Sequence, residues 1–353
     1  MSGALRLSKF NLIKVALGRL TVPLTKSFYE SIPVALAAIV LGLTMAGRVA
    51  AQPVMPSVSI GIGPGTLGHI PLVVAKEKDY FREEGIRLEL IQIKAGLNVP
   101  AMIEGGLDYS GIMGIPINAA LQGMKFKILM VNSSLAMDLI VQPDIKSVQE
   151  LRGKRLAVDS LGVYSHTIAE EILARNGVNP REVTFMAMGS TPLRLAALQS
   201  KSVQATMLGV PQNLLAEELG FTRLVSAQEV VNLPQTGVAT LESRIQTAPE
   251  TAYRLVKATL KGLLHYRRDK ESSVKTLVKF LNLKDARLAH RIYDYSLKVF
   301  TEDGTIPVAF QQQAMEEAKR TTRTAKDVSS SEIFDFQFAR RAKSELASSG
   351  WRP

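Results

Sequence analysis

The spacing of apolar residues from residue 57 onward predicts strands that alternate with helices. Residues 57–62 alternate as in a strand, whereas residues 70–84 have helical spacing and stop at Gly85. Residues 86–93 again place apolar side chains at every second position. Because this alternation is typical of parallel sheets covered by helices, we expect an α/β fold with mainly parallel sheets.

A second series of the same kind follows the first. It begins with a strand at residues 155–158, continues with a helix near 164–176, and has strands near 183–188 and 203–208. Gly114-Ile115-Pro116 ends a strand in the first series, and Gly209-Val210-Pro211 ends one in the second. This repetition predicts two similar lobes rather than one long sheet.

After Leu241 the pattern becomes helical. Residues 247–250, Thr-Ala-Pro-Glu, read as a capping box that opens a helix through about Arg268. Further amphipathic segments are predicted near residues 271–281, 284–298 and 307–318, and a last helix ends near Ala347. Each of these helices is expected to cover a face of a lobe.

The first fifty residues read as an export signal. Six basic side chains and one acidic side chain lie in residues 1–51, and residues 31–47 form an uncharged, largely apolar core. Val49-Ala50-Ala51 then supplies small residues before a cleavage site at Gln52. This pattern predicts a secretory signal peptide and a periplasmic protein. A retained membrane anchor stays open as an alternative, and a mitochondrial transit peptide fits less well because it lacks such a core.

Composition excludes several classes of chemistry. The chain of 353 residues has no cysteine, which excludes disulfides, thiolate metal sites and a lipid-anchored cysteine. Its four histidines show no metal-ligand spacing, so no metal is expected. Outside residues 1–51 the chain carries 37 basic and 31 acidic side chains, a net charge of +6 without a dense basic run. That surface does not indicate nucleic-acid binding.

Four segments in a fixed order carry a family resemblance: residues 71–85, 106–109, 145–155 and 195–198. Together they resemble the nitrate, sulfonate and taurine type of ABC-transporter substrate-binding proteins, which share a domain with thiamine-pyrimidine-synthesis proteins. The resemblance runs from about residue 58 to 318. One departure is Lys201-Ser202-Val203-Gln204, where the family usually has Gly-x-Val/Leu-Asp; an acidic residue that pins a turn is missing there.

The resemblance implies a type II periplasmic binding protein with a two-lobe, Venus-flytrap fold. Lobe one is expected from residues 54–137 and 238–325, lobe two from 138–237, and residues 326–353 as a tail with a last helix. The implied function is capture of a small molecule in the interlobe cleft for an ABC importer, by closure of the lobes. It implies a permease in the inner membrane as partner, a monomer, and neither a cofactor nor catalysis.

Strand-to-helix turns are the expected ligand site, because unpaired helix amides and hydroxyl groups point into a cleft there. The turn at residues 160–165 is the favoured one, since it has two hydroxyls and a phenol next to a helix. Glycines in such turns also serve simply to make them tight. The candidate ligand-binding residues are Thr66, His69, Gly114, Ser134, Ser160, Tyr164, Ser165, Gly209 and Thr236.

Two other functions remain as alternatives. One is an envelope module that senses a ligand without transporting it. The other is an NADP-dependent oxidoreductase, because residues 63–68 match G-x-G-x-x-G, although Lys94 rather than an acid follows the next strand. Thiamine-pyrimidine enzymes carry a cysteine-rich motif that this chain lacks. No arginine clamp is evident in the turns, and Arg194, the nearest cation, is interpreted as a charge on a helix surface. We therefore expect a small organic ligand that is anionic or weakly polar.

Overall fold

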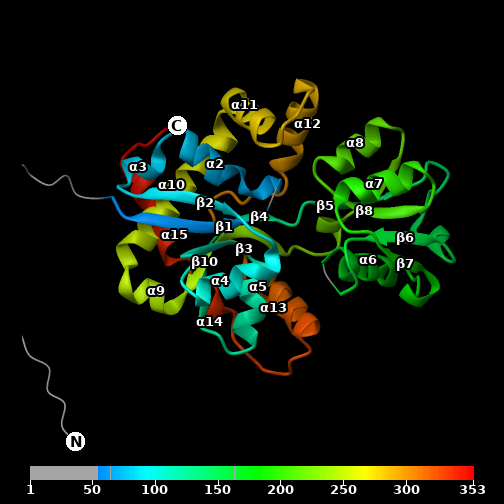
Figure 1. The fold of residues 1–353 in the computed structure, drawn as a ribbon, viewed down its shortest axis with the longest axis horizontal. Helices are drawn as coiled ribbons and strands as arrows, with labels where there is room; N and C mark the ends of the chain where they lie inside the picture. Colours follow the sequence, from blue (N-terminus) through cyan, green and yellow to red (C-terminus); the bar gives the residue numbers. More distant parts are fainter. Residues whose placement is uncertain (1–54, 64, 163) are drawn as a thin grey trace, which may run out of the picture. The chain divides into compact units, whose positions relative to one another are not determined.

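Two five-stranded sheets form the framework of the structure, a computed structural model that describes residues 55–353 except Pro64 and Val163 (Figure 1). The predicted signal segment lies outside the described residues. The first sheet has the order β2-β1-β3-β10-β4. Its strands are β1 (Ser57–Ile62), β2 (Arg87–Gln92), β3 (Tyr109–Ile112), β4 (Phe126–Ser134) and β10 (Pro234–Leu241). The second sheet has the order β7-β6-β8-β5-β9. Its strands are β5 (Met137–Val141), β6 (Arg155–Val158), β7 (Thr184–Ala187), β8 (Ala205–Gly209) and β9 (Thr222–Ser226).

The chain passes between the two sheets twice, after β4 and again after β9. We call the residues around the first sheet lobe one and those around the second sheet lobe two. The α/β fold and the duplicated series agree with the sequence prediction, but the sheets are mixed rather than mainly parallel. β10 is antiparallel to β3 and β4, and β5 is antiparallel to β8 and β9. The strands next to the crossings are therefore the ones that reverse the sheet direction.

The helices of lobe one cover both faces of the first sheet. They are η2 (Leu67–His69), α2 (Ile70–Glu77), α3 (Tyr80–Glu83), η3 (Ala95–Leu97), α4 (Asn98–Ile103) and α5 (Gly114–Leu121). The single helix expected over residues 70–84 is divided into α2 and α3. Asp79 causes the break, because its φ of 59° is left-handed and cannot continue a right-handed helix.

Lobe two repeats the same arrangement. Its helices are η4 (Val148–Leu151), α6 (Tyr164–Arg175), η5 (Pro180–Glu182), α7 (Thr191–Gln199), α8 (Gln212–Glu218) and η6 (Ala227–Glu229). The expected helix near residues 164–176 is α6, whose buried side chains include Ile168, Ile172 and Leu173. The two Gly-x-Pro turns are not equivalent: Pro116 lies within α5, whereas Pro211 precedes α8 and follows a cis peptide bond.

The turn before β8 retains its function despite the missing acid. In lobe one, the Asp108 carboxylate accepts a hydrogen bond from the Ser59 N–H at 2.8 Å. In lobe two, the Gln204 amide oxygen accepts one from the Arg155 N–H at 3.2 Å, between the corresponding strands. An amide oxygen is a hydrogen-bond acceptor like a carboxylate oxygen, so the turn is pinned without the charge.

The C-terminal helices complete lobe one. They are α9 (Glu242–Thr247), α10 (Pro249–Arg268), α11 (Lys270–Phe280), α12 (Ala286–Ser296), α13 (Val308–Thr322), α14 (Ser330–Ile333) and α15 (Gln337–Ser348). The capping box predicted at residue 247 is wrong, because Thr247 ends α9 and its hydroxyl donates to the Ser243 carbonyl. The segment expected as a tail packs on lobe one: Phe334 is buried and bridges to Ile128 of β4.

Within residues 55–353, apart from the two undescribed positions, no helix combines the length and the apolar character that a membrane span needs. The longest is α10, which is amphipathic and packs against α2 and α15 (Figure 1). It covers lobe one with Leu255, Val256 and Leu263 buried, while charged residues occupy its outer face.

Candidate functional site

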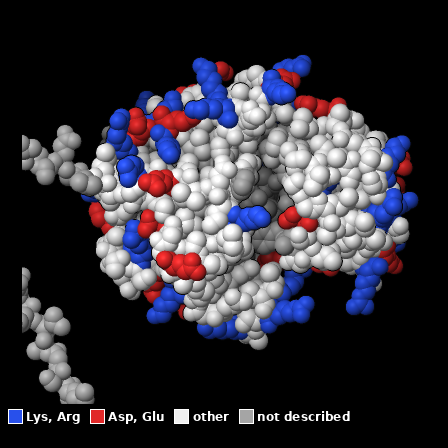
Figure 2. All heavy atoms as spheres, viewed as in Figure 1, with Lys and Arg blue, Asp and Glu red and all other residues white. Residues whose placement is uncertain are grey.

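Figure 2 shows a hollow between the lobes from one side. Neutral residues form most of its visible wall. Strand-to-helix turns of the two lobes meet where Tyr164 lies against Gly114. Turns after β1 and β3 belong to lobe one, and turns after β6, β7 and β8 belong to lobe two. Ligands of open α/β sheets bind at the carboxyl ends of the strands, so this is the position at which a small molecule is expected.

His69 is a fully buried, neutral imidazole in the first turn. Its Nε2 accepts a hydrogen bond from the Gly63 N–H at 3.0 Å. Burial lowers the pKa of His69 to about 3, so the ring is uncharged at neutral pH. Since Nε2 is an acceptor, the proton is on Nδ1, and that donor is buried without a partner among the described residues. A buried, unpaired donor is costly, which makes His69 a candidate to meet an acceptor.

The crossing strands fix the position of this turn through two hydroxyl groups. Thr236 donates to the Gly68 carbonyl at 2.9 Å and lies 2.8 Å from the hydroxyl of Ser133. Gly68 has no room for a side chain, because a Cβ there would lie 2.8 Å from the Thr236 Cγ2. Thr236 is buried and its proton is already donated, so it can offer a ligand only an acceptor.

Two further lobe-one candidates are half-buried. Thr66 precedes η2, and its carbonyl accepts from the His69 N–H at 3.1 Å. Ser134 ends β4, and its backbone N–H donates to the Val299 carbonyl at 2.9 Å. Their roles as ligand contacts stay predictions.

The turn at residues 160–165 is more occupied by internal hydrogen bonds than the sequence suggested. The hydroxyl of Ser165 is buried and accepts from the Asp159 N–H at 2.9 Å. The Gly162 N–H donates to the His166 imidazole at 3.1 Å. Ser160 is exposed and makes no such contact, which leaves it as the hydroxyl most available to a ligand.

Tyr164 and Gly114 are brought together across the lobes. The phenol of Tyr164, at the start of α6, lies against Gly114, at the start of α5: a Cβ there would lie 2.9 Å from the phenol Cζ. Burial, and then the charge of Glu317, raise the pKa of the Tyr164 hydroxyl, which therefore stays protonated. Gly209 is half-buried at the end of β8, where a Cβ would lie 3.3 Å from the Ala136 carbonyl.

Arg194 is a buried structural cation. Its guanidinium donates to the carbonyls of Gly189 and Met207 and to the Thr191 hydroxyl, the latter two at 3.0 and 3.2 Å. Burial lowers its pKa, and the nearest carboxylate, that of Asp159, is 3.9 Å away. The idea that Arg194 is a surface charge is therefore wrong. Its donors hold the ends of two strands together rather than facing a ligand.

A polar cluster at the first crossing was missed by the sequence reasoning. Asp138 of β5 is buried and accepts from Asn213 of α8 at 2.7 Å and from Tyr295 of α12 at 3.2 Å. Arg291 of α12 pairs with Glu217 at 3.0 Å, which adds a second link between α12 and α8. The available signal was one carboxylate within the otherwise apolar strand segment at residues 137–141.

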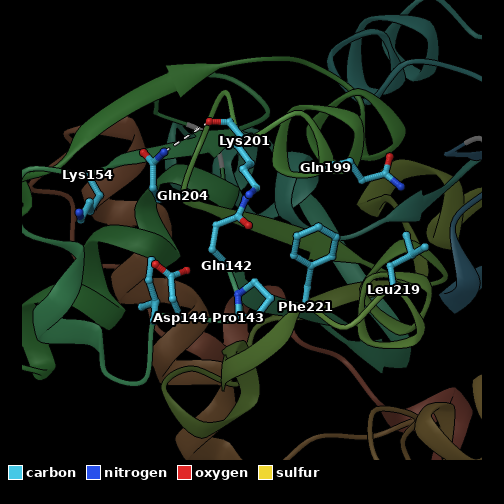
Figure 3. A pocket seen from close by; sticks show the side chains of 10 residues that line it. Gln142, Pro143, Asp144, Lys154, Gln199, Lys201, Gln204, Leu219 and Phe221 are labelled. Carbon is cyan, nitrogen blue, oxygen red and sulfur yellow. Dashed lines mark hydrogen bonds between the residues drawn. The ribbon is translucent and has the colours of Figure 1, made fainter.

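A separate cavity lies in lobe two near the amino ends of β6 and β8 (Figure 3). Its volume is about 540 Å³ and Lys154, Gln199 and Phe221 line it. Gln142 also lines it, but its amide already donates to the carbonyls of Leu198 and Val203. The Gln142 amide N–H groups are therefore committed to the backbone of lobe two.

No cluster of three or more histidine, aspartate or glutamate side chains in the described part of the chain could hold a metal ion. Residues 66–271 match the family model described as NMT1/THI5 like, which covers more than half of the chain. The chain belongs to the NMT1/THI5-like family. No curated protein sequence matches it closely enough to be a relative.

Solved structures of this fold agree with the family assignment. The periplasmic aliphatic sulphonate binding protein SsuA from Escherichia coli matches with a TM-score of 0.65 and 19% identity, over 78% of this chain and 96% of that one. The periplasmic nitrate-binding protein NrtA from Synechocystis PCC 6803 matches with a TM-score of 0.65 and 14% identity, over 83% and 89%. The desulfurization enzyme DSZB also matches, with a TM-score of 0.62 and 13% identity over 82% and 99%. These likenesses establish the periplasmic-binding-protein fold, and one of them is an enzyme.

Proposed function

We propose that this member of the NMT1/THI5-like family is the extracytoplasmic solute-binding protein of an ABC importer. The observation that carries the proposal is a fold of two lobes joined by two chain crossings, with a hollow between the lobes. A ligand that contacts both lobes has a higher affinity for the closed arrangement and shifts the population toward it. The closed protein then docks on a permease in the inner membrane.

The proposed ligand is a small organic molecule that is anionic or weakly polar. His69 supplies a buried Nδ1–H donor from lobe one, and the exposed Ser160 hydroxyl supplies a donor from lobe two. Arg194 is committed to carbonyl groups, so no salt bridge from that residue is available to a strong anion. Hydrogen bonds from neutral donors suit a ligand with a few acceptor atoms and an apolar body.

The proposal is tested by a thermal-shift screen of the protein beginning at Gln52 against sulfonates, nitrate and pyrimidine-type heterocycles. A ligand at a hundred times its Kd adds about 2.7 kcal/mol of stability, which raises Tm by about 5 °C or more in a chain of this size. Failure of all these compounds to raise Tm would contradict the proposed ligand class.

Catalysis and sensing make different predictions for the same protein. Because one protein with this fold is an enzyme, the fold alone does not decide the function. A binding protein returns its ligand unchanged after long incubation, which mass spectrometry measures. An envelope sensor would bind the ligand equally well, but deleting its gene would leave uptake of the labelled ligand by cells intact.

A further inference from the structure

The contact between Tyr164 and Gly114 joins two lobes that have no covalent link at this point. Tyr164 is the first residue of α6 in lobe two, and Gly114 is the first residue of α5 in lobe one. The ring is half-buried and lies at the space that a side chain on residue 114 would occupy. The contact therefore joins the two lobes beside the return crossing, because the N–H of Met113, the neighbour of Gly114, donates to the Gln235 carbonyl of β10 at 3.1 Å.

Lobe one surrounds this ring with both apolar and polar groups. Tyr164 and Ile115 pack against the same buried cluster, which includes Met113 of lobe one and Val158 of lobe two. Glu317 of α13 is close enough to raise the pKa of the phenol by its charge. Its Oε1 atom is buried and has no hydrogen-bond partner among the described residues, whereas its Oε2 accepts from Arg320 at 3.0 Å.

The glycine at position 114 is not required by the backbone. Its φ is not in the left-handed region, where glycine is favoured, and it occupies the first position of a helix. Alanine is a better helix former than glycine, so a methyl group would suit the local structure. The obstacle to a methyl group is the phenol of the opposite lobe.

We propose that Tyr164 is the interlobe latch: its ring seats on Gly114 when the lobes close. The latch rests on the proposed closure of the lobes. It adds to that proposal a contact between the lobes that stabilises the closed form together with the ligand. Tyr164 is then a positioning residue that sets the closed geometry, and Ser160 beside it remains available to the ligand.

The experiment measures the distance between the lobes without any ligand. Because the chain has no cysteine, the variants Lys275→Cys in α11 and Gln199→Cys in α7 introduce two unique labelling sites on exposed helix positions. Nitroxide labels on both sites report the distribution of interlobe distances by pulsed electron–electron resonance. This labelled chain is the reference for every variant.

Gly114→Ala and Tyr164→Ala should each lower the ratio of closed to open protein, by about fivefold or more. In the Tyr164→Ala background, adding Gly114→Ala should change nothing further, because the obstructing ring is gone. Gly96→Ala is the matched control, since a Cβ at Gly96 meets no atom within 4 Å. Tyr164→Phe should have an intermediate effect, as it keeps the ring and loses the hydroxyl.

The latch is overturned if Gly114→Ala leaves the distribution unchanged, or if it acts equally in the Tyr164→Ala background. A reference protein without a closed population also overturns it. Since no ligand is added, these outcomes are independent of whether the screened compounds bind. If no screened compound binds but Gly114→Ala changes the interlobe distances only when Tyr164 is present, the proposed ligand class is wrong and the latch is supported.

Discussion

His69 makes the stability of the fold depend on pH. Because the folded state lowers its pKa to about 3 from the usual 6.5, the unfolded state binds more protons between these values. Stability from this group is therefore complete above pH 6.5 and is lost as pH falls toward 3. At pH 5 the loss is about 2 kcal/mol, from 1.36 kcal/mol per pKa unit.

Urea unfolding at pH 7.5 and pH 5.0 measures this loss. His69→Gln is the matched variant, since an amide oxygen also accepts the Gly63 N–H and does not titrate in this range. The wild-type protein should lose about 2 kcal/mol more than the variant between the two pH values. Equal losses would mean that His69 is not the group responsible.

Ser165 and Ser160 have the same side chain and different roles in one turn. Ser165→Ala leaves the part-buried Asp159 N–H without its acceptor, which should cost about 0.5–1.5 kcal/mol of unfolding free energy. Ser160→Ala removes an exposed hydroxyl and should change stability by less than about 0.5 kcal/mol. Chemical unfolding of the two variants compares them directly, and equal stabilities would contradict the assignment.

Ligand affinity should depend on Ser160, although Ser160 contributes less to stability than Ser165. If Ser160 donates to the ligand, Ser160→Ala should weaken binding about threefold to a hundredfold, as one hydrogen bond does. The compound found by thermal shift serves as the titrant in calorimetry. An unchanged Kd for Ser160→Ala would remove Ser160 from the site.

At the scale of elements, the turn before β8 carries avoidable strain. Lys201 has a φ of 59°, in the position that Gly105 occupies with a φ of 78° in the corresponding turn of lobe one. A non-glycine residue in this region is disfavoured by contact of its Cβ with the backbone. Lobe two therefore retains the turn of lobe one at the expense of local strain.

Lys201→Gly should raise the free energy of unfolding by about 0.5–1 kcal/mol, after the greater freedom of glycine in the unfolded chain is counted. Lys201→Ala is the control, because alanine removes the charge and keeps the Cβ, and it should have little effect. Urea unfolding measures both. A gain with alanine equal to that with glycine would show that the lysine charge, not the backbone, is the cause.

The described molecule has two lobes joined by two crossings, and the sequence before them predicts an export signal. Export is expected from the uncharged core at residues 31–47 and the small residues before Gln52. Protein recovered from the periplasm should begin at Gln52 or within a few residues of it, as N-terminal sequencing measures. An intact chain recovered in the cytosol would contradict export and would return the NADP hypothesis to consideration.

Closure of the two lobes on ligand binding is also a property of the whole molecule. With the compound found by thermal shift at saturation, the radius of gyration from small-angle scattering should be smaller than that of the ligand-free protein, unless the latch already holds most molecules closed. The Tyr164→Ala variant distinguishes a protein that closes on binding from one that the latch already holds closed. Without ligand the variant should be more open than the wild type, so its radius of gyration should decrease more on binding. No contraction in either protein would contradict a flytrap mechanism.

The sequence by itself determined the elements and their order. Strand and helix periods are local properties, so residues 57–62, 86–93 and 164–176 were assigned close to their observed bounds. The break at Asp79 and the false capping box at Thr247 were not, because a left-handed residue and the end of a preceding helix leave no mark in the apolar period.

Only the tertiary structure decided which of the candidate residues can face a ligand. Thr236, Ser165 and Arg194 looked available in the sequence, yet each is committed to a backbone group: Thr236 and Arg194 donate to carbonyls of other elements, and Ser165 accepts from the N–H of Asp159. The contact of Tyr164 with Gly114 joins residues of different lobes, which no local pattern relates. The physical reason is that the apolar period of a segment indicates only which of its faces is buried. Hydrogen bonds between elements depend on how those elements pack in three dimensions.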